Sequence, residues 1–175
     1  MLAFQAGDVE SLTPLVEEYR DVLVGYLYRS VRDRAVAEEL AQEVFLRVCR
    51  VRNYQPTAKF RTWLFHIATN LAINWTRDRR TASCIVRLDE RQQFRSPAAS
   101  VEDYMVSCCL TDEVRAAVES LPERHRAAVL MHKYHDMEYR EIAAVLGCSV
   151  PALKSLLFRA YETLRERLAH LEENQ

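Results

Sequence analysis

Glycine and proline are scarce in this sequence, which has 3 Gly and 5 Pro among its 175 residues. Both residue types break helices and supply tight turns, so the chain has little material for repeated turns. Leucine, alanine, glutamate and arginine, which favour helices, are abundant instead. This composition predicts an all-α protein with short connections.

Long apolar runs are also lacking, since no stretch approaches the ~20 residues of a membrane span. The N-terminus has no basic segment followed by an apolar run, as a secretory signal would have. The sequence contains neither a glycine-rich phosphate loop nor a nucleophile elbow, so we expect no enzymatic activity. We therefore expect a soluble, cytoplasmic protein that is not inserted in a membrane.

The cysteines do not form a recognisable framework, because their number is odd and no C-x-x-C spacing occurs. They are Cys49, Cys84, Cys108, Cys109 and Cys148. Reduced thiols are the expectation, and neither a disulfide framework nor a zinc site is predicted. We expect no metal and no other cofactor.

Charge is distributed unevenly along a chain whose net charge is only −1. Residues 1–50 carry nine acids and six bases, whereas residues 51–80 carry six bases and the single acid Asp78. A basic segment in an otherwise acidic molecule is a candidate surface for nucleic-acid phosphates.

Apolar periodicity predicts three helices in the first half of the chain. The first follows Asp8, a possible N-cap, and the second covers 35–50 after a cap at Asp33. A short loop leads to a third helix over 61–77, with a buried face on one side and basic and polar residues on the other. These helices predict one small helical domain, residues 1–80.

The pattern lapses between residues 81 and 108, where no period is sustained, and resumes at TDEVRAAVESL. We therefore predict a flexible linker over 81–108 and a second helical domain over 109–175. The overall expectation is two small helical domains on one chain.

The segment EYREIAAVLGCSVPALKSLLFRA predicts a helix-turn-helix. Gly147 suits a left-handed helix end, Ser149 can cap the next helix, and Pro151 is tolerated in its first turn. The outward residues of the second helix can reach phosphates and base edges: Ser149, Lys154, Ser155, Phe158 and Arg159. An ordinary amphipathic hairpin remains the alternative for this segment alone.

Three segments in order, ELAQEVF, FRTWLFHIATN and LPERHR…EIAAVLG, resemble the extracytoplasmic-function sigma factors of bacterial RNA polymerase. The resemblance covers the chain from about Asp8 to Leu168 except the linker. It implies a non-enzymatic subunit that binds core RNA polymerase and promoter DNA, is a monomer when free, and is controlled by an anti-sigma factor. Residues 1–80 would be sigma region 2, and residues 109–175 sigma region 4.

The resemblance also assigns faces. The second helix would bind the polymerase through Glu39, Gln42, Glu43, Leu46 and Arg50. The loop and third helix would bind and hold open the minus-ten element through Tyr54, Lys59, Phe60, Arg61, His66, Asn70, Arg77, Arg79 and Arg80. Phe65 and Thr69 are expected beside them. The helix-turn-helix would read the minus-thirty-five element, although Pro151, Leu156 and Tyr161 depart from the family pattern.

Two other hypotheses are weighed beside this one. A repressor with a ligand-sensing N-terminal half would bind DNA without polymerase, but would have no need of the basic, aromatic loop. A metal protein could use His132 and His135, which have i, i+3 spacing, but no third ligand of suitable spacing is evident.

Overall fold

All regular structure in the described part of the chain is helical, and no strand occurs there. The computed structural model describes residues 1–5, 7–51, 58–86 and 112–172. The elements are α1 Leu2–Gln5, the 3-10 helix η1 Val9–Leu12, α2 Thr13–Val31, α3 Arg34–Arg50, α4 Phe60–Val86, α5 Asp112–Glu119, α6 Glu123–Tyr134, α7 Tyr139–Leu146 and α8 Val150–Glu172. The predicted all-α class is confirmed.

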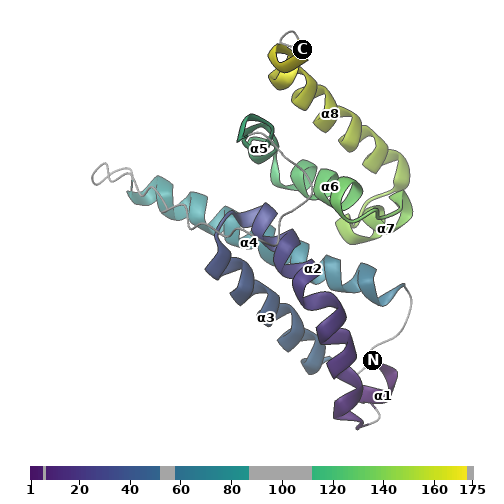
Figure 1. The fold of residues 1–175 in the computed structure, drawn as a ribbon. Coiled ribbons are helices and arrows are strands. Elements are labelled where there is room, and N and C mark those ends of the chain that lie inside the picture. Colours follow the sequence, from purple (N-terminus) through teal and green to yellow (C-terminus); the bar gives the residue numbers. More distant parts are fainter. Residues whose placement is uncertain (6, 52–57, 87–111, 173–175) are drawn as a thin grey trace.

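Helices α1 to α4 form the N-terminal bundle, and α5 to α8 form the C-terminal bundle (Figure 1). In the first of these, α3 begins where expected, because the Asp33 side chain accepts from the Val36 amide at 3.1 Å. The prediction for Asp8 is wrong in one respect. Asp8 caps the short helix η1, and α2 starts only at Thr13, with Pro14 in its first turn.

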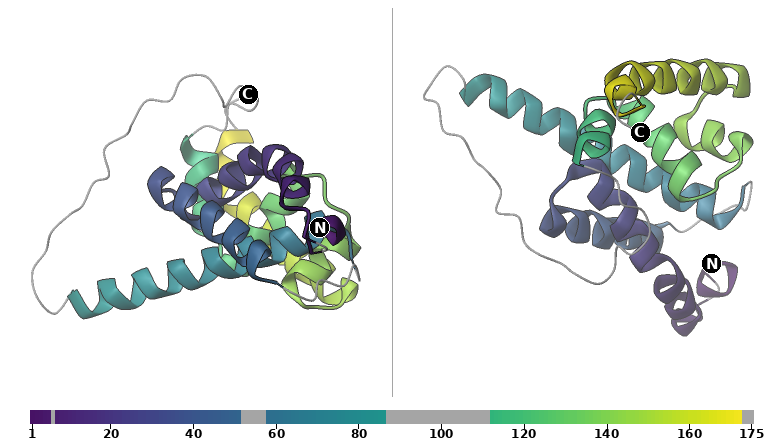
Figure 2. Two further views of the ribbon diagram at one scale, coloured as in Figure 1. Left: turned by 90° about the horizontal axis from the view of Figure 1, so that it is seen from below. Right: turned by 45° about the horizontal axis from the view of Figure 1, so that its top comes forward.

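Helix α4 is longer than predicted, since it continues to Val86 and so includes the first residues of the predicted linker. The segment DRRTASCIV contains neither glycine nor proline, so nothing in it interrupts the helical backbone after Arg77. Figure 2 shows the end of α4 projecting beyond both bundles. The rest of the predicted linker, residues 87–108, lies outside the described residues.

The helix-turn-helix forms as predicted, with α7 and α8 bent by 94°. Gly147 adopts φ 60°, and the amides of Gly147 and Cys148 donate to the carbonyls of Ala144 and Ala143 in the pattern of a Schellman motif. Ser149 Oγ accepts from the Ala152 amide at 3.3 Å and caps α8. These local bonds fix how α8 leaves α7.

The two bundles pack against each other, and their buried apolar residues form one continuous cluster. Helix α4 lies against both α6 and α7, and α2 also touches α6. The run 127–131 of α6 is buried at every position, as expected for a helix covered on all sides. Within the described residues no single helix is long and apolar enough to cross a membrane, although the bent pair α7 and α8 passes on length and composition alone.

Candidate nucleic-acid and protein interfaces

The predicted polymerase-binding residues lie along one side of α3, which we call the core-binding face: Glu39, Gln42, Glu43, Leu46 and Arg50. Four of the five are exposed, and Leu46 keeps 49% of its surface accessible to solvent. Glu43 pairs with Arg47 at 2.7 Å, and this hydrogen bond lowers the pKa of the Glu43 carboxyl. An exposed leucine among charges and an amide suits contact with another soluble protein.

The predicted minus-ten residues on and beside α4 form the strand face, whose described side chains are Lys59, Phe60, Arg61, His66, Asn70, Arg77 and Arg79. Lys59, His66 and Asn70 are exposed, and Arg61 is half-buried. Phe60 is half-buried and packs edge-on against Tyr19, with ring centroids 5.7 Å apart. Tyr54 and the side chain of Arg80 lie outside the described residues.

Two expectations for this helix are wrong, because Phe65 and Thr69 are buried rather than available to DNA. The Phe65 ring lies 5.0 Å from that of Tyr26 and 4.9 Å from that of His135. The Thr69 hydroxyl bonds to the Tyr26 hydroxyl at 2.8 Å. Burial raises the pKa of Tyr26 to about 12, so this phenol stays protonated and the bond persists over the ordinary pH range.

Basic side chains continue toward the projecting end of α4. Arg77 is exposed and contacts Asn74 and Asp78, and the Arg79 guanidinium lies 5.1 Å from the centre of the Trp75 ring. Trp75 itself packs against the core. Exposed arginines along a helix give a positive surface for phosphates without sequence preference.

The first turns of the strand face are bonded to the C-terminal bundle. Lys59 Nζ pairs with Glu141 Oε1 at 2.9 Å, and this bond raises the pKa of Lys59. Burial acts to raise the pKa of Glu141, but Lys59 and the Glu138 amide more than offset it, and the pKa is lowered. Arg61 donates to the His135 carbonyl. Glu141 and His135 are partners of this face that no local sequence signal indicated.

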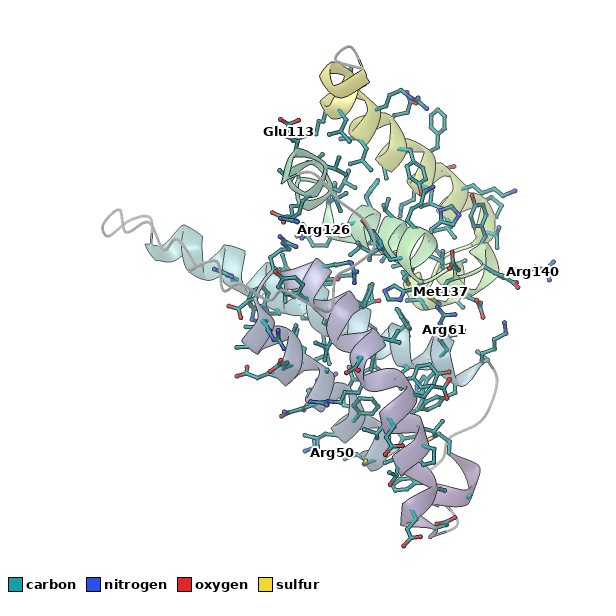
Figure 3. The ribbon with its side chains drawn as sticks, viewed as in Figure 1. Arg50, Arg61, Glu113, Arg126, Met137 and Arg140 are labelled. Atoms are coloured by element: carbon teal, nitrogen blue, oxygen red, sulfur yellow. The ribbon has the colours of Figure 1, made fainter. Side chains whose placement is uncertain are left out.

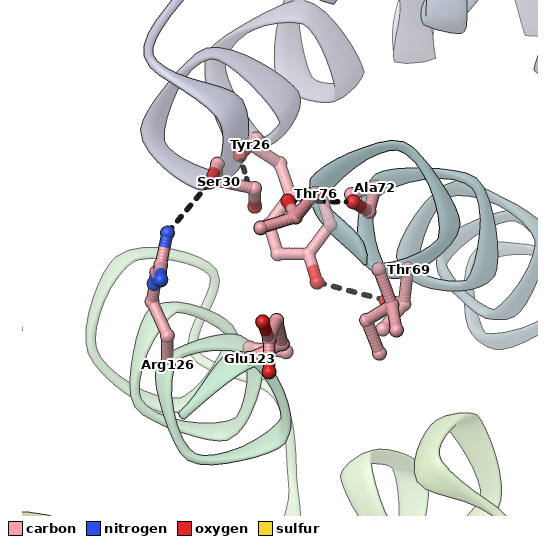
Figure 4. Close-up of a pocket in the computed structure, with 9 residues that line it drawn as sticks. Tyr26, Ser30, Thr69, Ala72, Thr76, Glu123 and Arg126 are labelled. Carbon is pink, nitrogen blue, oxygen red and sulfur yellow. Dashed lines mark hydrogen bonds between the residues drawn. The ribbon is translucent and has the colours of Figure 1, made fainter. Parts of the chain in front are cut away.

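A buried arginine of α6, Arg126, joins the two bundles. Arg126 is 7% exposed and donates to the carbonyls of Ser30 at 2.9 Å and Leu121 at 3.2 Å. The Ser30 carbonyl is in the last turn of α2, where a cation is favoured. Figure 4 shows the pocket beside it, lined by Tyr26, Ser30, Thr69, Ala72, Ile73, Thr76, Glu123, Arg126 and Ala127.

The outward residues of α8 form the duplex face, Ser149, Lys154, Ser155, Phe158 and Arg159, and all five are exposed. Phe158 is 66% accessible although it is a large apolar side chain. Of the positions that depart from the family pattern, Pro151 is exposed, Leu156 is half-buried against the core, and the Tyr161 hydroxyl bonds to His132 at 2.9 Å. An arginine at Tyr161 would lose this internal bond.

The histidine pair considered for metal binding has separate surroundings. His132 bonds to Tyr161, whereas His135 packs between Tyr26 and Phe65. Within the described ranges, no group of three or more His, Cys, Asp or Glu side chains is placed to hold a metal ion.

A helix-turn-helix with an exposed basic face, next to a second helical bundle with its own basic face, defines a two-part helical DNA-binding protein. Comparison with known proteins identifies the family. Residues 15–82 match sigma-70 region 2, and residues 111–164 match sigma-70, region 4. The chain belongs to the extracytoplasmic-function sigma factors of RNA polymerase, which are non-enzymatic transcription initiation factors.

Its relatives cover nearly the whole chain. RNA polymerase sigma-H factor of Pseudomonas aeruginosa is 31% identical, over 95% of this chain and 91% of the relative. Sigma factor CarQ of Myxococcus xanthus is 33% identical, over 98% of this chain and 97% of that relative. Sigma factor RpoE of Bartonella quintana, solved with the anti-sigma factor NepR, has the same fold, with a TM-score of 0.71 and 18% identity over 91% of this chain and 98% of that one. The repressor hypothesis is therefore wrong, because the N-terminal half is sigma region 2.

Proposed function

We propose that this sigma factor acts in the cytoplasm, where it binds bacterial core RNA polymerase through the core-binding face of α3. The strand face of α4 then holds one strand of the minus-ten element, and the duplex face of α8 reads the minus-thirty-five element in the major groove. The domain limits proposed are those of the sequence prediction, 1–80 and 109–175, with α4 continuing past the first limit to Val86.

The observation that carries this proposal is the exposed duplex face on a helix whose direction is fixed by the turn at Gly147. Lys154 and Arg159 are in reach of phosphates or guanine edges, and Phe158 is in reach of a thymine methyl. A chain with a net charge of −1 has little general attraction for DNA, so two linked weak readers would give specificity through effective concentration.

An anti-sigma factor is the proposed regulator. RpoE of Bartonella quintana was solved with the anti-sigma factor NepR, and CnrH was solved with the cytosolic domain of CnrY. The exposed apolar side chain Leu46 lies on the core-binding face, and Phe158 lies on the duplex face. A protein that covers both side chains would block both of these faces.

Transcription in vitro with bacterial core polymerase and a library of promoter sequences tests the proposal. We expect initiation from a subset of templates that share two short elements. Failure of the chain to bind core enzyme, or to initiate on any template, would refute the function proposed.

The strand face is tested by Asn70→Ala on the preferred template. Loss of one amide contact to an extruded base should cost about 1–3 kcal/mol, or roughly 5- to 150-fold in open-complex formation. Core binding should not change. Glu166→Gln is the control, because Glu166 is exposed on α8 and lies on none of the three faces. Loss of core association by Asn70→Ala would contradict the assignment.

A further inference from the structure

The C-terminal bundle occupies the part of α4 to which we assign the promoter strand. The contacts come from Lys59, just before α4, and from the first two turns of that helix. Lys59 Nζ is 2.9 Å from Glu141 Oε1, the Arg61 guanidinium donates to the His135 carbonyl, and His66 Nδ1 is 2.8 Å from the Val145 carbonyl oxygen. Figure 3 shows Arg61 directed toward the loop that contains Met137. Each donor would otherwise be available to a phosphate or a base.

Asn70 is held indirectly by the same arrangement. A carbonyl oxygen only accepts hydrogen bonds, so His66 Nδ1 must carry the proton that is donated to Val145. The other ring nitrogen, Nε2, is then an acceptor, and it receives the Asn70 amide at 3.1 Å. The residue that we expect to bind an extruded base is therefore already bonded through His66 to α7.

The interface extends beyond these polar contacts. The His135 ring packs edge-on against Phe65, at 4.9 Å, and against Tyr26, at 5.6 Å. The Arg29 guanidinium lies 4.7 Å from the centre of the Tyr134 ring, and Arg126 reaches the end of α2. Glu119 of α5 also pairs with Arg32 at 2.6 Å, so the arrangement combines aromatic packing, carbonyl acceptors and two acidic partners, as a specific interface does.

We propose that the C-terminal bundle and the promoter strand compete for the strand face, so that the free chain inhibits its own binding to DNA. The proposal rests on the assignment of this face to the promoter strand. It adds a regulated state, because Lys59, Arg61 and His66 each commit a donor to the C-terminal bundle, and Asn70 commits one to His66. Release of α7 from α4 must then precede strand capture.

The chemistry of the interface suggests that release is reversible. Lys59 keeps 69% of its side chain exposed, so its pair with Glu141, which is 13% exposed, is only partly shielded from water. Pairs of this kind change an equilibrium by small factors, and no single one holds the bundles together. A competing polyanion offers the same cations several negative charges at once.

Two variants weaken the interface without substituting any residue assigned to DNA. Glu141→Gln removes the charge that meets Lys59 but keeps an oxygen for the Glu138 amide, so the cap of α7 survives. His135→Lys places a cation beside Arg29 and Arg61 and keeps the carbonyl that Arg61 uses. Glu166→Gln is the matched control, since Glu166 is exposed on α8.

The test measures binding of each full-length chain, without polymerase, to a fluorescein-labelled single DNA strand of random sequence. Glu141→Gln should raise affinity roughly two- to fivefold. His135→Lys should raise this affinity further, on the order of 100-fold. The increase is smaller if the bundles are already fully separated before that factor is reached. Glu166→Gln should bind like the parent chain. Small-angle X-ray scattering should show a larger radius of gyration for His135→Lys than for the parent.

Holoenzyme assays separate this inference from the proposed function. With saturating core polymerase, all three variants should initiate transcription like the parent chain. If they do, but the free variants bind the single strand no better than the parent, the competition is refuted and the proposed function stands. A parent chain that scatters as openly as His135→Lys would also refute it. If no holoenzyme initiates, the proposed function fails.

Discussion

Acidification should open the interface between the bundles, because His135 is held neutral there. The pKa of His135 is lowered from 6.5 to about 4: burial is the largest cause, the nearby cations Arg29 on α2 and Arg61 on α4 add to it, and Asp136 acts in the opposite direction. Its packing partners Tyr26 and Phe65 and both arginines belong to the N-terminal bundle. When the bundles separate, the imidazole should regain an ordinary pKa near 6.5.

The size and sign of the effect follow from these two values. The pKa of His135 is lower in the closed state, so closure is most stable above pH 6.5 and weakens as the pH falls toward 4. The difference of 2.5 pKa units corresponds to about 3.4 kcal/mol, or roughly 300-fold in the closing equilibrium. The Glu141 pKa is also lowered, so loss of its charge adds to the opening only at the acid end of this range.

Proton NMR of the histidine ring signals measures the transition directly, with His135 assigned by the signal that His135→Lys lacks. Between the limits of 6.5 and about 4, each tenfold increase in the closing constant should lower the apparent pKa of His135 by about one unit. Glu141→Gln should move the apparent pKa upward, and Glu166→Gln should not. If His135 in the parent chain titrates near 6.5, the chain is open in solution and the reasoning is wrong.

Two further predictions concern the turn and the core-binding face. Gly147→Ala should cost about 1–2 kcal/mol, or roughly 2–8 °C in Tm by calorimetry, because Gly147 has φ 60° while no atom lies within 4 Å of an added Cβ. Gly147→Asn should cost less, since asparagine tolerates this conformation, and equal losses would contradict the conformational explanation. Leu46→Ala should weaken core-polymerase binding roughly fivefold by surface plasmon resonance, because the exposed 49% of this side chain offers about 1 kcal/mol of burial. Phe158→Ala is its reciprocal control, which should weaken promoter binding and leave core binding unchanged.

Local sequence signals predicted the elements of the fold well. The cap at Asp33, the left-handed glycine at Gly147 and the cap at Ser149 all depend on residues within a few positions of one another, and all three are confirmed. The apolar stripes that define the bundle cores are confirmed for the same reason. Such features require no knowledge of distant parts of the chain.

The errors about which side chains are buried arise where two distant segments meet, whereas those at Asp8 and at the end of α4 concern only helix limits. Phe65 and Thr69 are buried, against the expectation, because the His135 ring from the C-terminal bundle packs on Phe65 and the Tyr26 hydroxyl of α2 bonds to Thr69. The burial of Arg126 depends on the Ser30 carbonyl, which is 96 positions away in the sequence. One signal was available, since the unbroken apolar run at 127–131 requires a helix covered on all sides.

The positions of the three faces imply an order of events. Helix α3 packs against α2 and α4, across them from the C-terminal helices, and its core-binding face is exposed in the closed chain (Figure 1). The strand face is occupied in the same state. Core polymerase can therefore bind the closed chain first, and any preference of the polymerase for the open chain would shift the population toward release of α4. Under that preference, Glu141→Gln should strengthen core binding as well as strand binding, by the same two- to fivefold factor or less. If core affinity does not change while strand affinity rises, the polymerase binds both states equally and the promoter strand itself must displace α7.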